Sequence, residues 1–233
     1  HLREILTGDM IARAARRAGM EAELVFVVDN ADPLRKVYPF LDPTYEDFIG
    51  HQLGSIPAPD ADGKPDWKRF NEDGWTYGDH FLLPFLDALK QIGVTPRLLP
   101  NLEAYQSGKF SSAARIACDE PEAIREIIER VSGRELPASW FPWQPLDSKG
   151  SLDGSNITGY DYPLVHWTDS HGESGSSNIE KGEGKLPWRL DWPAKWGFNS
   201  ITCEPFGKDH GAAGGSYDTG KEIAVLFGHE PPA

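Results

Sequence analysis

Two neighbouring segments near the carboxyl end of the chain carry most of the side chains that could do chemistry. Residues 185–196 read KLPWRLDWPAKW, and residues 204–216 read EPFGKDHGAAGGS. Indole rings attract cations over their faces, a carboxylate pairs with an ammonium group, and a glycine-rich turn offers backbone N–H groups to phosphate. The combination predicts a site that holds a cationic side chain beside a polyphosphate, as in an enzyme that activates a small basic molecule with a nucleotide.

The first segment places three tryptophans and one acid on a single face of a helix. Trp188, Asp191, Trp192 and Trp196 stand at i, i+3, i+4 and i+8, and such positions are neighbours on a helix. Spacing alone favours an aromatic stripe of the core. The alternative is a ligand pocket, and it requires Asp191 to have no partner except a ligand cation, because an unpaired carboxylate among indoles is costly to bury.

The second segment joins an expected strand, residues 199–204, to an expected helix, residues 216–227. In parallel sheets ligands bind beyond the carboxyl ends of the strands, so Asp209 and His210 would face the crevice. A tight turn in which Asp209 caps the helix is the alternative interpretation. The match to the dinucleotide-binding pattern GxGxxG is poor, which argues against hydride transfer.

A further pair of acids closes the apolar run at residues 23–29. Asp29 and Asp32 would lie at the carboxyl end of that strand, where carboxylates suit an amine or the hydroxyls of a ribose. A simple turn is the alternative, because Asn30 and Asp32 are turn formers. Arg35 and Lys36 either contact phosphate or pair with these acids.

The elements that must position these groups alternate between helices and strands. Apolar residues at helical spacing predict a first helix ended by Gly19, and Asp79 is expected to cap another that Gly93 ends. Further helices are expected at residues 107–120 and 121–131. Strands are expected at 23–29, buried on both faces, and at 94–99, and a β insertion with little core of its own at 147–184. The face of the first helix is Leu2, Ile5, Leu6, Met10 and Ala14.

This order indicates an α/β fold with a Rossmann-like parallel sheet and a connecting α+β insertion. We expect the first part of the Rossmann domain at residues 1–37 and its second part at 185–233. Residues 38–184 would hold the remaining Rossmann elements, at about 79–100, together with the helical and β insertions.

Composition excludes several classes of protein. The net charge of -13 argues against non-specific nucleic-acid binding, although a local RNA-binding face stays open. No apolar run approaches the roughly 20 residues that cross a bilayer, so no membrane partner is expected. Cys118 and Cys203 form no CxxC pair and are expected to be buried, which favours a reducing cytoplasm. His166 and His171 have no companion ligands, so no metal site is expected there.

At these residues the chain resembles the class I, archaeal-type lysyl-tRNA synthetases. The matching stretches, in the family's order, are HLREILTGDMIARAARRAG, VFVVDNADPLRK, HFLLPFLDAL, GRELP with its following tryptophan, KLPWRLDWPAKW and EPFGKDHGAAGGSYDTGK. The resemblance implies the class I synthetase type of Rossmann domain. It makes His1 the last residue of the HIGH-type ATP signature and a catalytic residue, with the KMSKS-like signature expected after Ala233. A central portion of this kind is expected to be inactive alone.

The resemblance also implies the reactants and the roles of single residues. L-lysine, ATP with Mg²⁺, and tRNA(Lys) are the expected partners, and lysyl-adenylate is the expected intermediate. The lysine side of the site would comprise Trp188, Asp191, Trp192, His210 and Asp29, and the nucleotide side Gly207, Asp209, Gly214, Gly215 and Ser216.

Residues 147–173 contain no cysteine, so the structural zinc of the family's insertion is not expected here. A monomer is favoured, with the oligomeric state left open. A non-catalytic paralogue that binds lysine or RNA is the alternative function.

Overall fold

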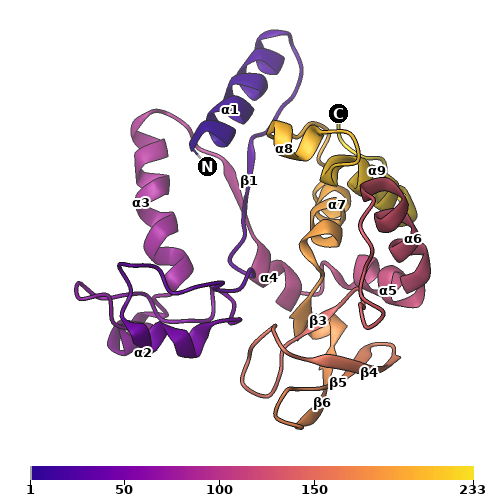
Figure 1. Ribbon diagram of the computed structural model, residues 1–233. Helices are drawn as coiled ribbons and strands as arrows, with labels where there is room; N and C mark the ends of the chain where they lie inside the picture. The colour runs from indigo at the N-terminus through magenta and orange to yellow at the C-terminus, as the bar shows by residue number, and fades with distance from the viewer. Residues whose placement is uncertain (1) are drawn as a thin grey trace. The chain divides into compact units, whose positions relative to one another are not determined.

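A computed structural model describes residues 2–233, and its elements are labelled in Figure 1. The chain forms two compact units. The first contains the residues up to Glu103 together with Lys149–Asp153, and the second contains Ala104–Ser148 and Gly154–Ala233. The three-part division predicted above stays a prediction. Among the described helices, none has the length and apolar character needed to cross a membrane.

The first unit contains a two-stranded parallel sheet and the helices that the sequence predicts beside it. Strand β1 (Val25–Val28) pairs with β2 (Arg97–Pro100), with Val25 opposite Arg97. Helix α1 (Leu2–Arg17) ends before Gly19, whose φ of 83° favours glycine. Two details of the prediction are wrong: only Ile5 of the expected face of α1 is buried, and only Val28 of β1 is buried.

The N-cap of helix α3 (Tyr77–Gln91) lies three residues before Asp79, the cap that the sequence suggested. Thr76 is the N-cap, and Asp79 accepts its hydroxyl and backbone N–H in return, which completes a capping box. The expected end at Gly93, with φ of 73°, is confirmed. Leu89 on this helix packs with Ile5 and Val94 in a buried cluster.

Between the strands the chain makes an excursion with its own small core. It contains the 3₁₀ helix η1 (Pro43–Phe48) and helix α2 (Trp67–Asp73). The core consists of apolar and aromatic side chains that are buried together: Leu34, Leu41, Tyr45, Ile56 and Tyr77. Helix α4 (Asn101–Gln106) follows β2 and leads into the second unit.

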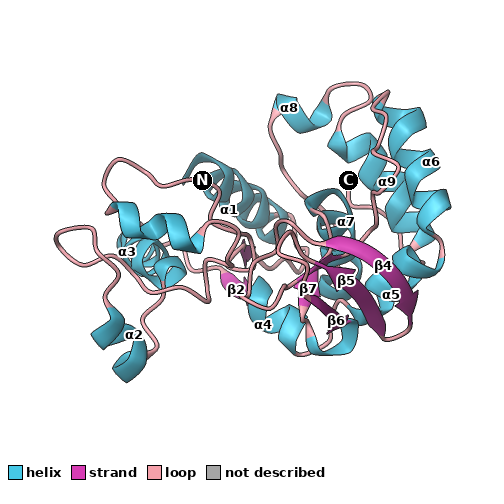
Figure 2. Ribbon diagram, turned by 60° about the horizontal axis from the view of Figure 1, so that its bottom comes forward, coloured by secondary structure: helices cyan, strands magenta, loops and turns pink. Residues whose placement is uncertain are grey.

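The second unit combines helices with short antiparallel strands, as Figure 2 shows. Its helices are α5 (Ser111–Asp119), α6 (Pro121–Ser132), α7 (Trp188–Asn199), α8 (Lys208–Gly211) and α9 (Ser216–Leu226). Helix α9 packs against α6 and α7. The expected start of α6 at Pro121 is confirmed, and Ile124 and Ile128 of its apolar stripe are buried.

The β insertion has more core than the sequence suggested. Strands β4 (Asn156–Asp161), β5 (Leu164–Thr168) and β6 (Ser174–Asn178) form an antiparallel sheet, followed by the 3₁₀ helix η2 (Ile179–Lys181). Val165 and Trp167 are buried, and Trp143 Nε1 donates to Ser177 Oγ at 2.8 Å. Strands β3 (Gln144–Pro145) and β7 (Gly184–Lys185) pair antiparallel beside it.

The strand expected at residues 199–204 is absent, and this prediction is wrong. Ser200 takes a left-handed conformation with φ of 53°. Ser200 and Ile201 donate their N–H groups back to the end of α7, to Gly197 and Trp196, and the segment then bonds Ala233, from Ala233 N–H to the Thr202 carbonyl and from Glu204 N–H to the Ala233 carbonyl. The described fold therefore has mixed helices and strands with a small parallel sheet of two strands.

Candidate functional site

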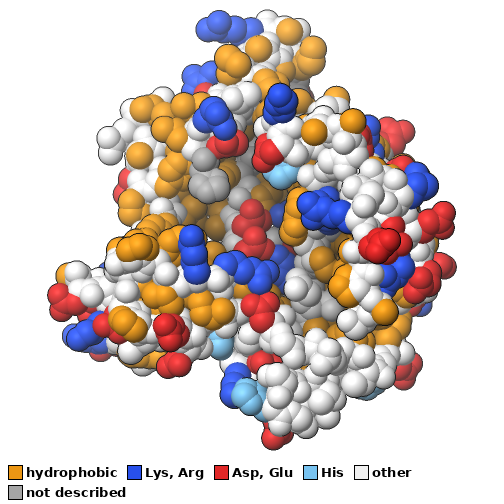
Figure 3. Space-filling model, viewed as in Figure 1, with side chains coloured by type: hydrophobic (Ala, Val, Ile, Leu, Met, Phe, Trp, Pro, Cys, Tyr) orange, Lys and Arg blue, Asp and Glu red, His pale blue; other side chains and the backbone are white. Residues whose placement is uncertain are grey.

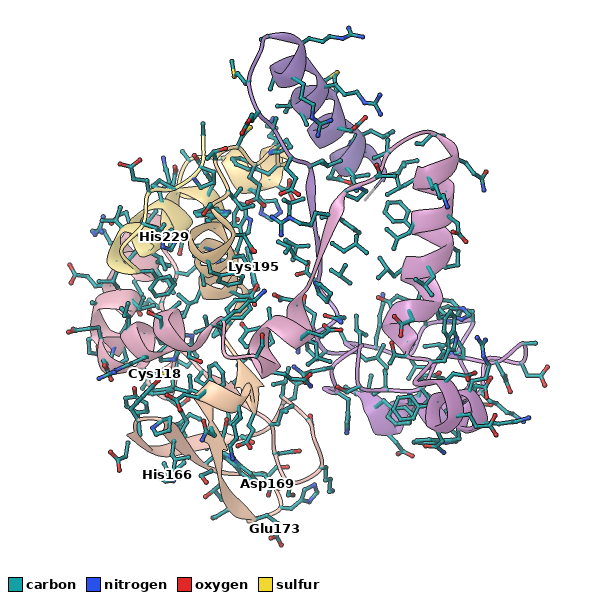
Figure 4. The ribbon with its side chains drawn as sticks, turned by 180° about the vertical axis from the view of Figure 1, so that it is seen from behind. Cys118, His166, Asp169, Glu173, Lys195 and His229 are labelled. Atoms are coloured by element: carbon teal, nitrogen blue, oxygen red, sulfur yellow. The ribbon has the colours of Figure 1, made fainter. Side chains whose placement is uncertain are left out.

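Helix α7 carries the predicted tryptophan face, and its packing fixes where that face lies. Gly220 of α9 permits close approach, because a Cβ there would lie 2.8 Å from the ring of Trp196. Gly197 similarly leaves room for the imidazole of His229, whose Nε2 bonds the Pro193 carbonyl at 2.7 Å. Figure 4 labels Lys195 on α7 and His229 after α9. Trp196 is therefore a core residue, as the first interpretation of the stripe expected.

Asp191 lies in a buried network of charges. Its Oδ1 accepts from Lys195 Nζ at 2.7 Å, and its Oδ2 accepts from the Tyr105 hydroxyl at 2.6 Å. The same Tyr105 oxygen accepts the backbone N–H of Leu186 at 3.1 Å. Lys185 is also buried and acts electrostatically on the carboxylate.

This network overturns the condition on which the pocket interpretation of Asp191 rested. Burial raises the pKa of Asp191, but the charges of Lys195 and Lys185 and the hydrogen bonds hold it below its usual value. The carboxylate is therefore ionised and already neutralised by protein cations. The sequence offered a signal for this, because an acid and a lysine four residues apart on a helix commonly pair.

The exposed end of α7 meets His210 in an aromatic cluster. The ring centroid of His210 lies 6.0 Å from that of Trp188 and 5.4 Å from that of Trp192. Trp188 is 46% exposed, and its indole already has the guanidinium carbon of Arg189 4.7 Å from its centroid. The structure thus brings together the three ring residues predicted for the lysine side, and one of them holds a cation over its face.

Glu204 supports this cluster and was missed by the sequence analysis. Its Oε1 accepts the indole N–H of Trp192 at 2.5 Å, and its Oε2 accepts that of Trp196. A carboxylate at the N–H edge makes an indole ring more electron-rich, which strengthens its attraction for a cation. Phe206 and Tyr217 complete the packing around Trp192 and Trp196.

The glycine-rich turn is more self-contained than predicted. Gly214 has a φ of 73° and donates its N–H to Asp218 Oδ2 at 3.0 Å, while Gly215 N–H donates to the Ala212 carbonyl at 2.7 Å. The expectation of free N–H groups is therefore wrong for these two residues. Ser216, the first residue of α9, bonds His210 Nδ1 through its hydroxyl at 2.8 Å.

Asp209 does not cap the helix expected at residues 216–227, because Gly215 is the N-cap of α9, and Asp209 lies within the short helix α8, whose N-cap is Gly207. Asp209 instead lies in the first turn, with Oδ2 3.5 Å from His210 Nε2, and its side chain is exposed. The side chains of Asp209 and His210, which were expected to face a crevice, therefore lie against each other. The imidazole of His210 is oriented from both of its nitrogens, by Asp209 and by Ser216.

In the first unit the acids after β1 form a turn, as the alternative interpretation held. Asn30 organises it: Oδ1 accepts the N–H of Leu102 at 2.8 Å, and Nδ2 donates to Glu103 Oε2 at 3.0 Å. Asp29 is exposed beside it, in a different unit from the aromatic cluster. Its predicted role on the lysine side stays a prediction. Arg35 pairs with Asp153 at 3.0 Å rather than with Asp29 or Asp32.

His1, predicted to be catalytic, lies outside the described residues. Among residues 2–233, no group of three or more His, Cys, Asp or Glu side chains could hold a metal ion. Within the cysteine-free residues 147–173, Asp169 accepts the N–H groups of His171 and Glu173 at 2.8 and 3.0 Å. Figure 4 labels Asp169 and Glu173. Burial raises the pKa of Asp169, yet these bonds bring it below the usual value.

The two cysteines differ in their surroundings. Cys118 is buried as predicted, and burial raises the pKa of its thiol. Cys203 is exposed, which contradicts the expectation of burial. It lies in the segment that was expected to be a strand of the core and is not.

Comparison with known proteins identifies the family. The profile of the family described as tRNA synthetases class I (K) matches residues 1–233. The chain belongs to this family. It is 42% identical over its whole length to the lysine–tRNA ligase of Thermoplasma acidophilum and 42% identical to that of Archaeoglobus fulgidus, covering 44% and 45% of those proteins. The lysine–tRNA ligase of Methanosarcina barkeri is 40% identical, with 42% of its length covered.

The class I synthetase resemblance deduced from the motifs is thereby confirmed. This synthetase-family chain spans less than half the length of these relatives. No sequence pattern could have revealed Tyr105 as part of the site, because it precedes Asp191 by 86 residues. Glu204 lies within the matching stretch EPFGKDHG, but its spacing from Trp192 and Trp196 does not predict that it accepts both of their indole N–H groups.

Proposed function

We propose that this chain is part of a lysine–tRNA ligase, which activates L-lysine with ATP and transfers it to tRNA(Lys). Its family and its relatives, together with the ring cluster of Trp188, Trp192 and His210, support the proposal. We also propose that the two parallel strands of the first unit belong to a Rossmann-like sheet of the class I synthetase type. A cytoplasmic location belongs to the same proposal.

The observation that carries the proposal is the partly exposed cluster of Trp188, Trp192 and His210, which we call the aromatic corner. Trp188 and Trp192 are only partly buried, so a cation can approach them from solvent. Glu204 fixes the indole of Trp192 through its N–H group. Cation–π attraction at such a partly exposed site is worth about 1–2 kcal/mol per ring. His210 would bound the lysine side chain from beside the two indoles.

Asp191 enters the proposal as a positioning residue. Its ion pair with Lys195 and its bond from Tyr105 anchor the first turn of α7, from which Trp188 projects. The nucleotide side would comprise Gly207, Asp209, Gly214, Gly215 and Ser216, with the first turn of α9 favouring negative charge. Asp29 at the end of β1 would contact an amine or a ribose.

The activation step needs no general base, because the lysine carboxylate is ionised at neutral pH. The carboxylate attacks the α-phosphorus of ATP, and pyrophosphate leaves with the electron pair of the broken P–O bond. A hydroxyl of the terminal ribose of tRNA then attacks the carbonyl carbon of lysyl-adenylate, AMP leaves, and the hydroxyl proton passes to a phosphate oxygen or to solvent. Mg²⁺ is held mainly by the phosphates of ATP and requires few protein ligands. The protein contributes by positioning the reactants and stabilising charge.

Lysine-dependent exchange of pyrophosphate into ATP, measured with the natural full-length protein, tests this function. Trp188→Ala should raise the KM for lysine about tenfold and leave the KM for ATP nearly unchanged. Trp67→Ala is the matched control, because Trp67 is 51% exposed and belongs to the other unit. Exchange that depends on arginine or glutamate and not on lysine would refute the substrate. A folded wild-type protein without any exchange would favour the non-catalytic paralogue.

A further inference from the structure

The first unit carries an exposed aromatic surface that the adenylation chemistry does not use. Tyr38, Phe40 and Phe81 are 38%, 54% and 45% exposed, although rings of this size are usually better buried. The rings of Tyr38 and Phe40 stack with centroids 5.7 Å apart and planes inclined by 15°. Phe81 meets Phe40 edge-on at 5.8 Å. We call these three side chains the aromatic platform.

The aromatic platform lines an open cavity of about 270 Å³ within the first unit. Its lining is completed by side chains that are mostly apolar: Pro33, Leu34, Arg35, Leu53 and Tyr77. Tyr77 is buried and packs against Phe81, with ring centroids 5.0 Å apart, and so helps to fix the Phe81 ring. The site thus offers flat rings on a fixed base, open to solvent on one side.

Two cations stand at the edge of the aromatic platform. Lys36 Nζ lies 5.1 Å from the ring centroid of Tyr38, and no carboxylate among the described residues pairs with it. Arg35 lines the cavity and shares an exposed ion pair with Asp153. Exposed pairs of this kind are weak, so Arg35 can exchange its partner for a phosphate. Figure 3 shows orange apolar side chains gathered on the first unit with blue basic side chains beside them.

The acids close in sequence to the aromatic platform are occupied by the backbone. Asp42 accepts the N–H of Thr44 at 3.0 Å and caps η1. Asp60 accepts the N–H groups of Asp62 and Lys64, both at 2.9 Å. Both carboxylates stay ionised, but the ion pair of Arg35 is with Asp153 and not with either of them.

We propose that the aromatic platform binds unpaired nucleotides of RNA, with bases stacked on Phe40 and Phe81 and the sugar–phosphate backbone along Lys36 and Arg35. Stacked rings flanked by cations are the usual means of holding single-stranded nucleic acid. The occupant to which we commit is the single-stranded 3′ end of the tRNA. This choice rests on the proposed function, because only tRNA brings such an end to the protein.

The test is binding of a short fluorescein-labelled single-stranded RNA ending in CCA, followed by fluorescence anisotropy with the natural full-length protein. Phe40→Ala and Phe81→Ala should each raise the Kd about tenfold. Phe40→Tyr should keep the wild-type Kd, whereas Phe40→Leu, which retains apolar volume without a ring, should lose affinity as Ala does. Lys36→Gln should raise the Kd a few-fold and reduce the slope of log Kd against log salt concentration by about one.

Trp67→Ala is the matched control, because Trp67 is an exposed ring followed by Lys68 and Arg69. It should leave the Kd unchanged. Wild-type affinity in Phe40→Leu, or an equal loss in Trp67→Ala, would overturn the proposal. So would displacement of the RNA by ATP alone, which would make the surface a free-nucleotide site. A dimer that Phe40→Ala converts to a monomer, with RNA affinity unchanged, would make it an interface between two copies.

Lysine-dependent pyrophosphate exchange separates this proposal from the proposed function, since exchange needs no tRNA. Phe40→Ala and Phe81→Ala should exchange at the wild-type rate and show a raised KM for tRNA only in the transfer step. If the wild-type protein binds the RNA through these rings but never exchanges, the proposed function fails and the RNA site stands. If both variants exchange normally and bind the RNA as tightly as the wild type, the RNA site fails and the proposed function stands.

Discussion

The Tyr105 hydroxyl allows a sharp test of how the buried charges hold the candidate site. It donates to the ionised Asp191 at 2.6 Å and accepts the N–H of Leu186 at 3.1 Å. Tyr105→Phe removes this one oxygen and keeps the ring, which stacks on Phe110 with centroids 3.8 Å apart. The substitution therefore probes the hydroxyl, including these two hydrogen bonds, without opening a large cavity.

The expected cost follows from these two bonds. A hydrogen bond to a charged group contributes about 1.5–3 kcal/mol, and a buried N–H left without a partner costs about 1–3 kcal/mol. Leu186 is fully buried, so its N–H has little access to water. Because neighbouring effects are not additive, we expect the free energy of unfolding to fall by about 3–4 kcal/mol in total. For a chain of 233 residues that lowers the Tm by about 10 °C.

Urea unfolding followed by tryptophan fluorescence is the assay. All tryptophans except Trp67 and Trp75 belong to the second unit, so the signal reports mainly on it. The matched control is Tyr217→Phe in the same unit, whose hydroxyl donates to the neutral Pro232 carbonyl at 2.6 Å. It should cost about 1 kcal/mol. The reasoning fails if Tyr105→Phe costs no more than Tyr217→Phe.

Three further outcomes follow from the same network and its surroundings. Asp191→Asn should destabilise the second unit by about 3–5 kcal/mol in urea unfolding, because it leaves Lys195 and Lys185 uncompensated, and adding Lys195→Met should recover part of the loss. The pKa of Asp191 is held below the ordinary 3.8, so its contribution should be complete above pH 3.8 and disappear as the pH falls through the lower folded value; unfolding energies of wild type and Asp191→Asn should therefore converge in acid. Glu204→Gln should raise the KM for lysine a few-fold in pyrophosphate exchange, since a neutral amide polarises the indoles less, and an unchanged KM would count against the aromatic corner.

Much of the helical framework could be predicted because its signals are local. Pro121 at the start of α6 and the glycines at positions 19 and 93 act within one turn of their own helix. The strand at residues 199–204 failed for the opposite reason. Ile201 and Thr202 favour extended backbone, but a strand needs a partner strand, and here Ile201 bonds the end of α7 while Thr202 and Glu204 bond the single residue Ala233.

The candidate site could be located from its residue types, but its electrostatics could not be worked out. The tryptophan face was correct in position, and the condition placed on Asp191 was wrong. Lys195, one helical turn further on, could have been recognised as its partner. Tyr105 could not, because contacts across 86 residues depend on tertiary packing that no periodicity encodes.

The two interpretations of the tryptophan stripe turn out to describe its two ends. Trp196 and Asp191 lie in the core, where α9 and the buried lysines hold them, whereas Trp188 is open to solvent beside His210. A ligand cation gains more from rings that are already fixed, because no side-chain entropy has to be lost on binding. The buried charges of α7 therefore serve recognition indirectly: they hold the helix so that its exposed rings are preorganised for a cation.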